Sequence, residues 1–173
     1  INTIYFGGGS PSILSVGEIS FFLEKISSCF NLASDPEITL EANPDDLDLH
    51  KSKGLKAAGI NRLSIGIQSF RDKDLKLMNR AHNTEMVLKC IENVRSTGFE
   101  NLNIDLIYGI PGLSQSDWEE NLEQFLKIRP EHLSAYNLTF EDRTAFGHWL
   151  KKGKIKEQED EAVIDQFKLL MEK

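Results

Sequence analysis

Short apolar runs alternate with amphipathic helical patterns along most of this chain, and that alternation restricts its fold more than any other feature. The apolar runs predict five strands, at Thr3–Phe6, Ile38–Glu41, Arg62–Ile67, Leu102–Tyr108 and His132–Leu138. Between them, apolar residues recur at the three- and four-residue spacing of a helix. Strands that alternate with helices are typical of βα units around a parallel sheet. The sequence therefore predicts an α/β fold.

Three of the predicted helices are recognised by an apolar face: Ile19, Phe22, Leu23, Ile26 and Phe30; Val87, Leu88, Ile91 and Val94, ended by Gly98; and Trp118, Leu122, Phe125 and Leu126. Two further helices are expected from about Asp46 to Ala58, closed by Gly59, and from Asp72 to Asn79. Ser116 and Glu119 have the spacing of a capping box, so we expect the helix of Trp118 to begin there. Residues 151–161 are nearly all charged, which is typical of a solvated face or linker. A last apolar face is formed by Val163, Ile164, Phe167, Leu170 and Met171. We expect a barrel core over residues 1–150, and a charged connector with an amphipathic helix over residues 151–173 that leads to a further C-terminal part.

Three of the predicted strands separate an apolar face from a polar face, because successive side chains of a strand point to opposite sides. The apolar set is Ile38, Leu40, Leu63, Ile65, Ile67, Leu102, Ile104 and Leu106, and the polar set is Thr39, Glu41, Ser64, Gly66, Gln68, Asn103 and Asp105. A closed eight-stranded barrel fills its interior with Val, Ile and Leu. A polar interior instead predicts an open, incomplete βα barrel. In the fifth strand, Ser134 and Tyr136 compete with Ala135 and Asn137 for the inner side.

Composition excludes some partners and leaves others open. A net charge of −7 disfavours nucleic acid as the main partner, because phosphate binding needs clustered Lys and Arg. No apolar run approaches the roughly 20 residues that span a membrane, so we expect no membrane span and a cytoplasmic protein. Cys29 and Cys90 lie far apart within helical patterns and suggest neither a zinc site nor a disulfide. We interpret both as core thiols.

Polar and glycine residues gather where the predicted strands end. Gly7, Gly8, Gly9 and Ser10 follow the first strand, Glu41 and Gln68 end the second and third, Asp105 lies in the fourth, and Thr139 follows the fifth. In α/β barrels this end carries the active site. Consecutive glycines let a ligand contact the backbone directly. Carboxylate and amide acceptors beside them suit a ligand with hydroxyls, an amine and a purine, such as a nucleoside.

Single rim residues also have purely structural interpretations. Glu41 could pair with Arg62 or Arg80, Gln68 could cap a strand end, and Asp105 could accept an ordinary hydrogen bond. The glycine run could be a tight βα turn. His82 and His132 are interpreted as packing or surface residues rather than metal ligands. No order of Ser, His and Asp and no acid/base carboxylate pair stands out.

Five motifs carry a resemblance to a known family. They are residues 6–12 (Phe-Gly-Gly-Gly-Ser-Pro-Ser), 40–44 (Leu-Glu-Ala-Asn-Pro), 61–70 (Asn-Arg-Leu-Ser-Ile-Gly-Ile-Gln-Ser-Phe), 79–82 (Asn-Arg-Ala-His) and 103–112 (Asn-Ile-Asp-Leu-Ile-Tyr-Gly-Ile-Pro-Gly). In this order they resemble the radical S-adenosylmethionine family of oxygen-independent coproporphyrinogen III oxidases and their relatives. The true oxidases have Asp at the positions of Asn43 and Ser69, whereas the heme-chaperone branch resembles the residues found here. The resemblance therefore favours a heme chaperone of tetrapyrrole metabolism over oxidative decarboxylation of coproporphyrinogen III to protoporphyrinogen IX.

The resemblance also implies cofactors and their contacts. Gly7 to Ser10 would receive the methionine end of S-adenosylmethionine, Glu41 would hold the same cofactor, and the positions of Gly9, Ser10, Gln68, Arg80, Asp105 and Thr139 contact a second S-adenosylmethionine in the oxidases. Heme or a porphyrinogen would be the larger ligand, and an unidentified protein would accept the heme.

One family feature has no counterpart here. Family members hold a 4Fe–4S cluster with three cysteines spaced Cys-x3-Cys-x2-Cys after the first strand of the barrel, and neither Cys29 nor Cys90 matches that loop. We interpret the chain as a fragment whose first barrel strand and cluster loop lie upstream of Ile1, and we expect it to be inactive alone. A barrel aldolase or phosphate-binding isomerase is a remote alternative, since no Lys lies at a predicted strand end to form a Schiff base.

Overall fold

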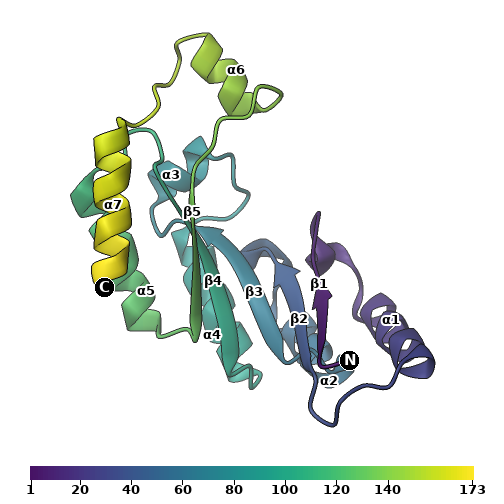
Figure 1. Ribbon diagram of the computed structural model, residues 1–173. Helices are drawn as coiled ribbons and strands as arrows, with labels where there is room; N and C mark the ends of the chain where they lie inside the picture. Colours follow the sequence, from purple (N-terminus) through teal and green to yellow (C-terminus); the bar gives the residue numbers. More distant parts are fainter.

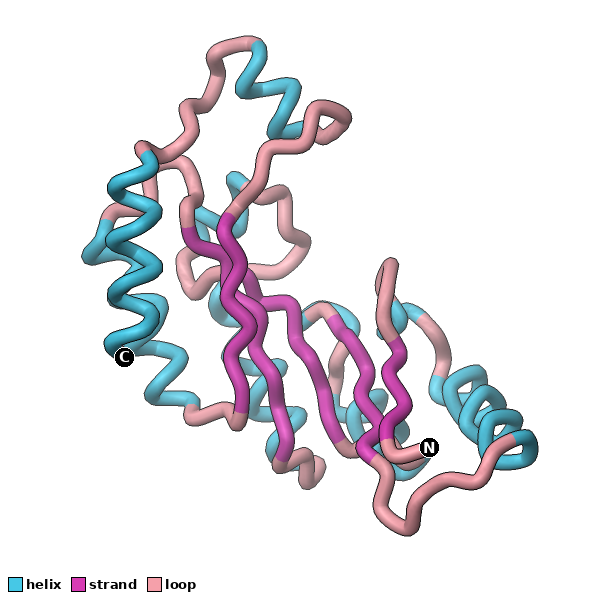
Figure 2. The backbone as a smooth tube through the Cα atoms, viewed as in Figure 1, coloured by secondary structure: helices cyan, strands magenta, loops and turns pink.

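The computed structural model describes residues 1–173 and is built on one five-stranded parallel sheet (Figures 1 and 2). The strands are β1 (Thr3–Phe6), β2 (Glu37–Ala42), β3 (Arg62–Gln68), β4 (Asn101–Tyr108) and β5 (His132–Asn137). They lie in the order of the sequence, and every neighbouring pair is parallel. Because β1 and β5 do not pair with each other, the sheet stays open. The predicted α/β fold, an incomplete βα barrel, is confirmed.

Helices connect the strands. They are α1 (Val16–Cys29), α2 (Leu49–Ala58), α3 (Asp72–Leu77), α4 (Thr84–Ser96), α5 (Gln115–Ile128), α6 (Ala145–Lys151) and α7 (Asp160–Glu172), with short 3-10 turns at Pro11–Ile13 and Pro44–Asp46. Gly59 follows α2 at φ 107° and Gly98 follows α4 at φ 86°, conformations that glycine adopts without strain. The chain therefore makes successive βα units, and α7 lies beside α5 (Figure 1).

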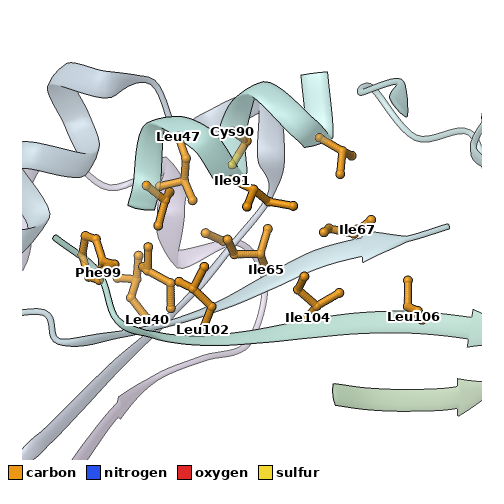
Figure 3. Packing of buried hydrophobic residues seen from close by; sticks show 14 of the residues in the cluster. Leu40, Leu47, Ile65, Ile67, Cys90, Ile91, Phe99, Leu102, Ile104 and Leu106 are labelled. Carbon is orange, nitrogen blue, oxygen red and sulfur yellow. The ribbon is translucent and has the colours of Figure 1, made fainter. Parts of the chain in front are cut away.

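The core fills the space between the apolar face of the sheet and the helices that cover it. Leu40, Leu63, Ile65, Leu102 and Ile104 are all fully buried. Figure 3 shows Leu40, Ile65, Leu102 and Ile104 on the same side of the sheet as Cys90 and Ile91 of α4, with Phe99 at one end. The predicted apolar face is thus confirmed. Burial of this face leaves the alternate, polar side chains on the opposite side of the sheet.

The polar face of the sheet carries a chain of hydrogen bonds across β3, β4 and β5. The Asn103 amide donates to Ser64 Oγ at 2.8 Å and to Asp105 Oδ1 at 2.6 Å, and Ser134 Oγ donates to Asn103 Oδ1 at 3.1 Å. His132 Nδ1 also contacts Asn103 Oδ1. Ser134 and His132 therefore lie on the inner side of β5, which settles the ambiguity of the fifth strand.

Four expectations about the helices are wrong in detail. The capping box of α5 is made by Ser114 and Asp117, not by Ser116 and Glu119. The helix expected from Asp46 begins at Leu49, because Asp48 caps it by accepting from Lys51 N at 2.7 Å. Phe22, Phe30 and Leu88 were expected on buried faces and are 45%, 57% and 41% exposed. Cys29, expected in the core, is exposed at the end of α1, whereas Cys90 is buried.

The short helix α6 was not predicted, and one glycine makes it possible. A Cβ placed on Gly147 would lie 2.2 Å from the backbone oxygen of Glu141 and 3.1 Å from Asp142 Cα. Thr144 caps the helix by accepting from Gly147 N at 3.2 Å. The rings of Phe140, Phe146 and Trp149 then pack edge to face, with centroids 5.8 and 5.6 Å apart.

We expect Gly147→Ala to displace α6 from the turn before it, because backbone atoms cannot yield as a flexible side chain can. Limited proteolysis between residues 141 and 156 should be markedly faster in this variant, with little change in global unfolding. Gly17→Ala in α1 is the control, since the nearest atom to its Cβ position is Ser15 Oγ at 3.9 Å, an ordinary contact distance. Equal cleavage of Gly147→Ala and the parent protein would contradict the argument.

No helix in this fold combines the length and the apolar composition that crossing a bilayer requires.

Candidate functional site

A polar cleft of about 240 Å³ lies at the carboxyl ends of the first four strands. It is lined by Gly9, Ser10, Pro11, Ser12, Glu41, Ala42, Asn43, Ser64, Gly66, Gln68, Arg80 and Asp105. Six of the nine residues predicted from sequence meet here: Gly9, Ser10, Glu41, Gln68, Arg80 and Asp105. Gly7 and Gly8 line an adjoining, more apolar hollow with Phe6 and Phe22. Thr139 lies apart, in a hollow with Gly109 and Phe140.

Glu41 holds the glycine loop that forms one wall of the cleft. Its Oε1 accepts from Tyr5 Oη at 2.8 Å, and its Oε2 accepts from Gly8 N at 3.0 Å. Gly8 and Gly9 have φ of 78° and 61°, and nothing lies within 4 Å of the Cβ position of Gly9. The loop thus presents bare backbone to open space. Because each carboxylate oxygen has two lone pairs, Glu41 can still accept from a ligand.

The loop is also tied to the segment after β2. Ser12, 1% exposed, donates through Oγ to Asp46 Oδ2 at 2.6 Å and accepts from Asn43 N at 3.3 Å. Lys51 Nζ donates to the Ser12 carbonyl oxygen. Sequence reasoning missed Tyr5, Ser12, Asp46 and Lys51 as supports of the site. Their only sequence signal was nearness to the glycine run and to Pro44.

Gln68 brings an unsatisfied acceptor into the cleft. Its φ is 68°, and the register between β3 and β4 shifts between Gly66 and Gln68. The side-chain Oε1 is buried and has no hydrogen-bond partner. A Cβ on Gly66 would lie 2.8 Å from Gln68 Nε2, so glycine leaves the space in which the amide lies. A buried acceptor without a donor costs free energy, and a ligand donor would remove that cost.

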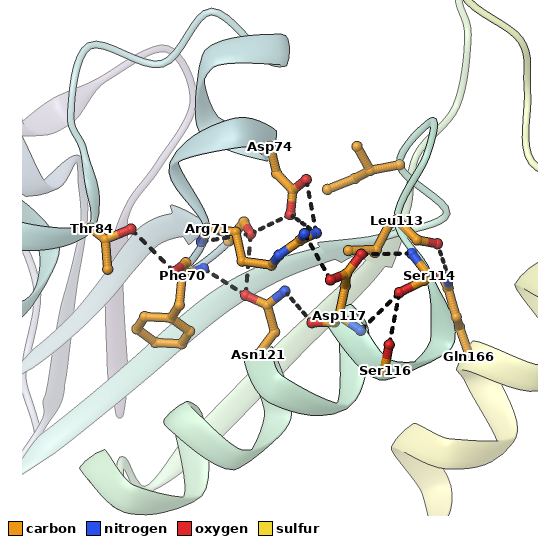
Figure 4. Close-up of polar contacts among 12 residues, drawn as sticks. Phe70, Arg71, Asp74, Thr84, Leu113, Ser114, Ser116, Asp117, Asn121 and Gln166 are labelled. Carbon is orange, nitrogen blue, oxygen red and sulfur yellow. Dashed lines mark hydrogen bonds and ion pairs between the residues drawn. The ribbon is translucent and has the colours of Figure 1, made fainter.

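A buried polar network fixes the turn that follows Gln68 (Figure 4). Asn121 of α5 accepts from Phe70 N at 2.6 Å and from Ser69 Oγ at 3.1 Å. Asp74, 2% exposed, accepts from Ser69 Oγ at 2.8 Å and from Arg71 Nη1 at 3.3 Å. Arg71 also pairs with Asp117 of α5 at 2.8 Å. The strained backbone at Gln68 is therefore held by contacts from both α3 and α5.

His82 is buried and contacts groups of the protein through both ring nitrogens. It is 3% exposed, its Nε2 donates to the Ile67 carbonyl oxygen at 3.1 Å, and its Nδ1 lies 3.5 Å from Asp45 Oδ1. Because a carbonyl can only accept, Nε2 carries the proton. The interpretation of His82 as a packing residue is confirmed.

Asp105 is the cleft carboxyl with a perturbed proton affinity. Burial raises its pKa, hydrogen bonds from Asn103 and Ser64 oppose that rise, and the charge of Glu41 adds to it. Burial and Glu41 also raise the pKa of Tyr5. Two carboxylates in one half-buried cleft suit a ligand that brings positive charge or hydroxyl donors.

Replacing Asp105 by Asn should therefore stabilise the protein at neutral pH. With its pKa raised, folded wild-type protein binds the proton more tightly than the unfolded chain, so its stability rises as pH falls through the folded pKa toward the ordinary value of 3.8. Asp105→Asn keeps an acceptor for Asn103 but carries no buried charge. The variant should melt at a higher temperature than the wild-type protein at pH 7, and this difference should vanish toward pH 4. A lower melting temperature at pH 7 would contradict this assignment.

A larger hollow, of about 420 Å³, lies between the start of α5 and α7 and contains none of the predicted site residues. Its floor is occupied by Gln166, which accepts from Gly109 N at 2.8 Å and donates to the Leu113 carbonyl oxygen at 3.0 Å. These bonds satisfy backbone groups of the loop after β4 and hold α7 against that loop. We therefore interpret this hollow as a result of helix packing. The rim cleft is the candidate site because of its chemistry rather than its size.

The chain's own side chains do not form a metal or iron–sulfur centre. No group of three or more His, Cys, Asp or Glu side chains is placed to hold a metal ion. Cys29 and Cys90 lie on different helices, and burial raises the pKa of the Cys90 thiol to about 12. The cleft residues do fit S-adenosylmethionine, because they offer Arg80 for a carboxylate and the free Gln68 Oε1 and the carboxylates for an ammonium group and hydroxyls.

Sequence comparison places residues 1–125 within the model of the Radical SAM superfamily. The chain is 36% identical to the heme chaperone HemW of Bacillus subtilis, over all of this chain and 46% of that protein. It is 37% identical to HemW of Escherichia coli, over 85% of this chain and 39% of that protein. The chain thus spans less than half the length of these relatives.

Solved structures share the fold. Coproporphyrinogen III oxidase (HemN) of Escherichia coli, titled a radical SAM enzyme, superposes with a TM-score of 0.85 at 29% identity, over 99% of this chain and 39% of that chain. Elp3 of Methanocaldococcus infernus superposes with a TM-score of 0.81 at 18% identity, over 95% and 43%. The second likeness concerns the fold alone.

Proposed function

The chain belongs to the Radical SAM superfamily, and on that premise we propose that it is the S-adenosylmethionine-binding part of a cytoplasmic heme chaperone. The observation that carries the proposal is the rim cleft, which is lined by Gln68, whose buried Oε1 has no partner, together with glycine backbone, two carboxylates and an arginine. The identity to HemW proteins over the whole chain supports the choice of a heme chaperone. S-adenosylmethionine, when bound, would supply the radical chemistry for which the superfamily is named.

In this proposal each cleft residue has a distinct task. The backbone of Gly7 to Ser10 contacts the methionine end of the cofactor, and Glu41 keeps that loop in place while accepting from the ligand. Gln68 Oε1 accepts a hydrogen bond from the ligand, and Asp105 accepts from a hydroxyl or ammonium group. Arg80 donates to a carboxylate. Thr139 would contact the ligand only from the neighbouring hollow. The 4Fe–4S cluster would be bound by residues outside this chain.

A second candidate is oxidation of coproporphyrinogen III, favoured by the structural likeness to HemN. Both candidates involve a tetrapyrrole with carboxylate side chains and need the same rim cleft. They differ in outcome, because a chaperone keeps and transfers heme, whereas an oxidase changes its substrate. Only the chaperone would need a partner protein that receives the heme.

One experiment separates the two. The full-length protein, reconstituted anaerobically with iron and sulfide, is incubated with heme, and in parallel with coproporphyrinogen III, S-adenosylmethionine and a reductant. We expect a stable heme complex and no loss of mass from the porphyrinogen. Formation of protoporphyrinogen would replace the chaperone by the oxidase, and absence of both results would reject both.

A further inference from the structure

Asn43 joins three segments of the rim at one point. Its Nδ2 donates to Ser10 Oγ at 3.3 Å, its backbone N–H donates to Ser12 Oγ at 3.3 Å, and its Oδ1 accepts from Arg80 Nη2 at 2.8 Å. Ser10 and Ser12 belong to the loop after β1, and Arg80 belongs to the segment after α3. One amide therefore sets the position of the arginine relative to the glycine loop.

The guanidinium of Arg80 has only neutral partners. Besides Asn43 Oδ1, Nη2 donates to the Gly66 carbonyl oxygen at 3.3 Å. Arg80 forms none of the salt bridges in the chain. Burial lowers its pKa, and the more distant charge of Asp45 opposes that shift only in part. The carboxylate of Asp45 lies instead near His82. Arg80 thus brings to the cleft a partly desolvated positive charge that has no ion-pair partner.

We propose that Asn43 determines ligand specificity by positioning Arg80 with a neutral acceptor, which keeps its charge available for the carboxylate of a bound ligand. This inference rests on the proposed function, which supplies two sources of such a carboxylate, S-adenosylmethionine and a tetrapyrrole. An aspartate at position 43 would have the same shape and would accept from Arg80 as an ion pair. The arginine would then be neutralised from within the protein, and a ligand carboxylate would meet an added negative charge.

The test is equilibrium binding to the full-length, reconstituted protein with Asn43→Asp. S-adenosylmethionine is compared with decarboxylated S-adenosylmethionine, which lacks only the carboxylate and keeps the sulfonium and the amine, and heme is compared with heme dimethyl ester, in which the carboxylates are blocked. We expect Asn43→Asp to weaken binding of at least one carboxylate ligand by about 10- to 100-fold, the usual loss for a charge-assisted contact. Its blocked counterpart should change by less than about threefold. Which pair responds identifies the source of the carboxylate.

Two further variants separate the charge effect from a general change. Asn83→Asp adds the same charge at the N-cap of α4, where a carboxylate can still accept from Met86 N, and it should leave all four affinities unchanged. In an Arg80→Gln background, Asn43→Asp should have little additional effect, because the charge it neutralises is gone.

Unchanged binding of both carboxylate ligands by Asn43→Asp would overturn the inference. Equal losses for each ligand and its blocked counterpart would also overturn it, because they would indicate a distorted cleft. Wild-type protein that binds neither S-adenosylmethionine nor heme would reject the proposed function and this inference together. Wild-type binding with no selective loss would reject the inference alone.

Discussion

Replacing Arg71 by alanine should destabilise the fold by about 3–5 kcal/mol, because it leaves the buried carboxylate of Asp74 without its charged partner. Asp74 is 2% exposed and accepts from Arg71 Nη1 through both oxygens at 3.3 Å. Arg71 also bridges to Asp117 at 2.8 Å, which attaches α5 to the turn after β3. Urea unfolding of the two proteins measures the difference.

Lys89→Ala provides the matched control. Its ion pair with Glu92 has a similar N–O distance of 2.8 Å, but the two side chains are 64% and 70% exposed. Exposed pairs contribute about 0–1 kcal/mol. If Arg71→Ala costs no more than Lys89→Ala, the network of Figure 4 does not stabilise the turn. The turn carries Gln68, so the destabilised variant should also bind S-adenosylmethionine less tightly.

The sheet could be predicted from sequence because its strands obey a simple period. In β2, β3 and β4, a buried Leu or Ile alternates with Ser, Asn, Asp or Glu. Because the helices bury the apolar face of the sheet, the polar side chains must point toward the interior of the open barrel. The rim cluster followed from the same logic, since parallel strands bring their carboxyl ends together. Glu41, Gln68 and Asp105 were found in this way.

Helix details were less predictable, because local patterns fit more than one solution. Ser114 with Asp117 and Ser116 with Glu119 satisfy the same capping spacing, and only the preceding turn decides between them. The spacing of apolar residues predicts which face of a helix is apolar, but not how much of that face is buried by other elements. On α1, Ile19 and Leu23 are buried while Phe22 is 45% exposed. The helix α6 is short, and its formation depends on a close approach of the backbone at Gly147. The spacing of apolar residues in the sequence does not indicate such a contact.

Parts of the site also depended on long-range geometry. The contact of Asn43 with Arg80 joins residues 37 positions apart, and nothing in either local pattern indicates it. Thr139 was grouped with the other rim residues because it follows a strand, yet it lies in a separate hollow beside Phe140. The end of a strand predicts the edge of the sheet at which a residue lies, but not the cavity that it lines.

Glu41→Ala should reduce the affinity for S-adenosylmethionine by about 100-fold, the loss expected when a charged acceptor disappears and the loop it holds is released. Without the carboxylate, Gly8 N and Tyr5 Oη lose their acceptor, and the backbone of the glycine loop is free to leave the cleft. Equilibrium dialysis with the reconstituted full-length protein measures the loss. The effect on global stability should be small, because Tyr5 and Gly8 are exposed to water.

Glu41→Gln distinguishes the two tasks of this residue. The amide oxygen can accept from Gly8 N while the amide nitrogen donates to Tyr5 Oη, since a phenol oxygen also accepts. The loop should therefore keep its place, and only the negative charge is lost. A loss of about tenfold in affinity would show that the negative charge of Glu41 acts on the ligand. The remaining difference in affinity between Glu41→Gln and Glu41→Ala would measure the contribution of loop positioning. Wild-type affinity in Glu41→Ala would remove Glu41 from the site altogether.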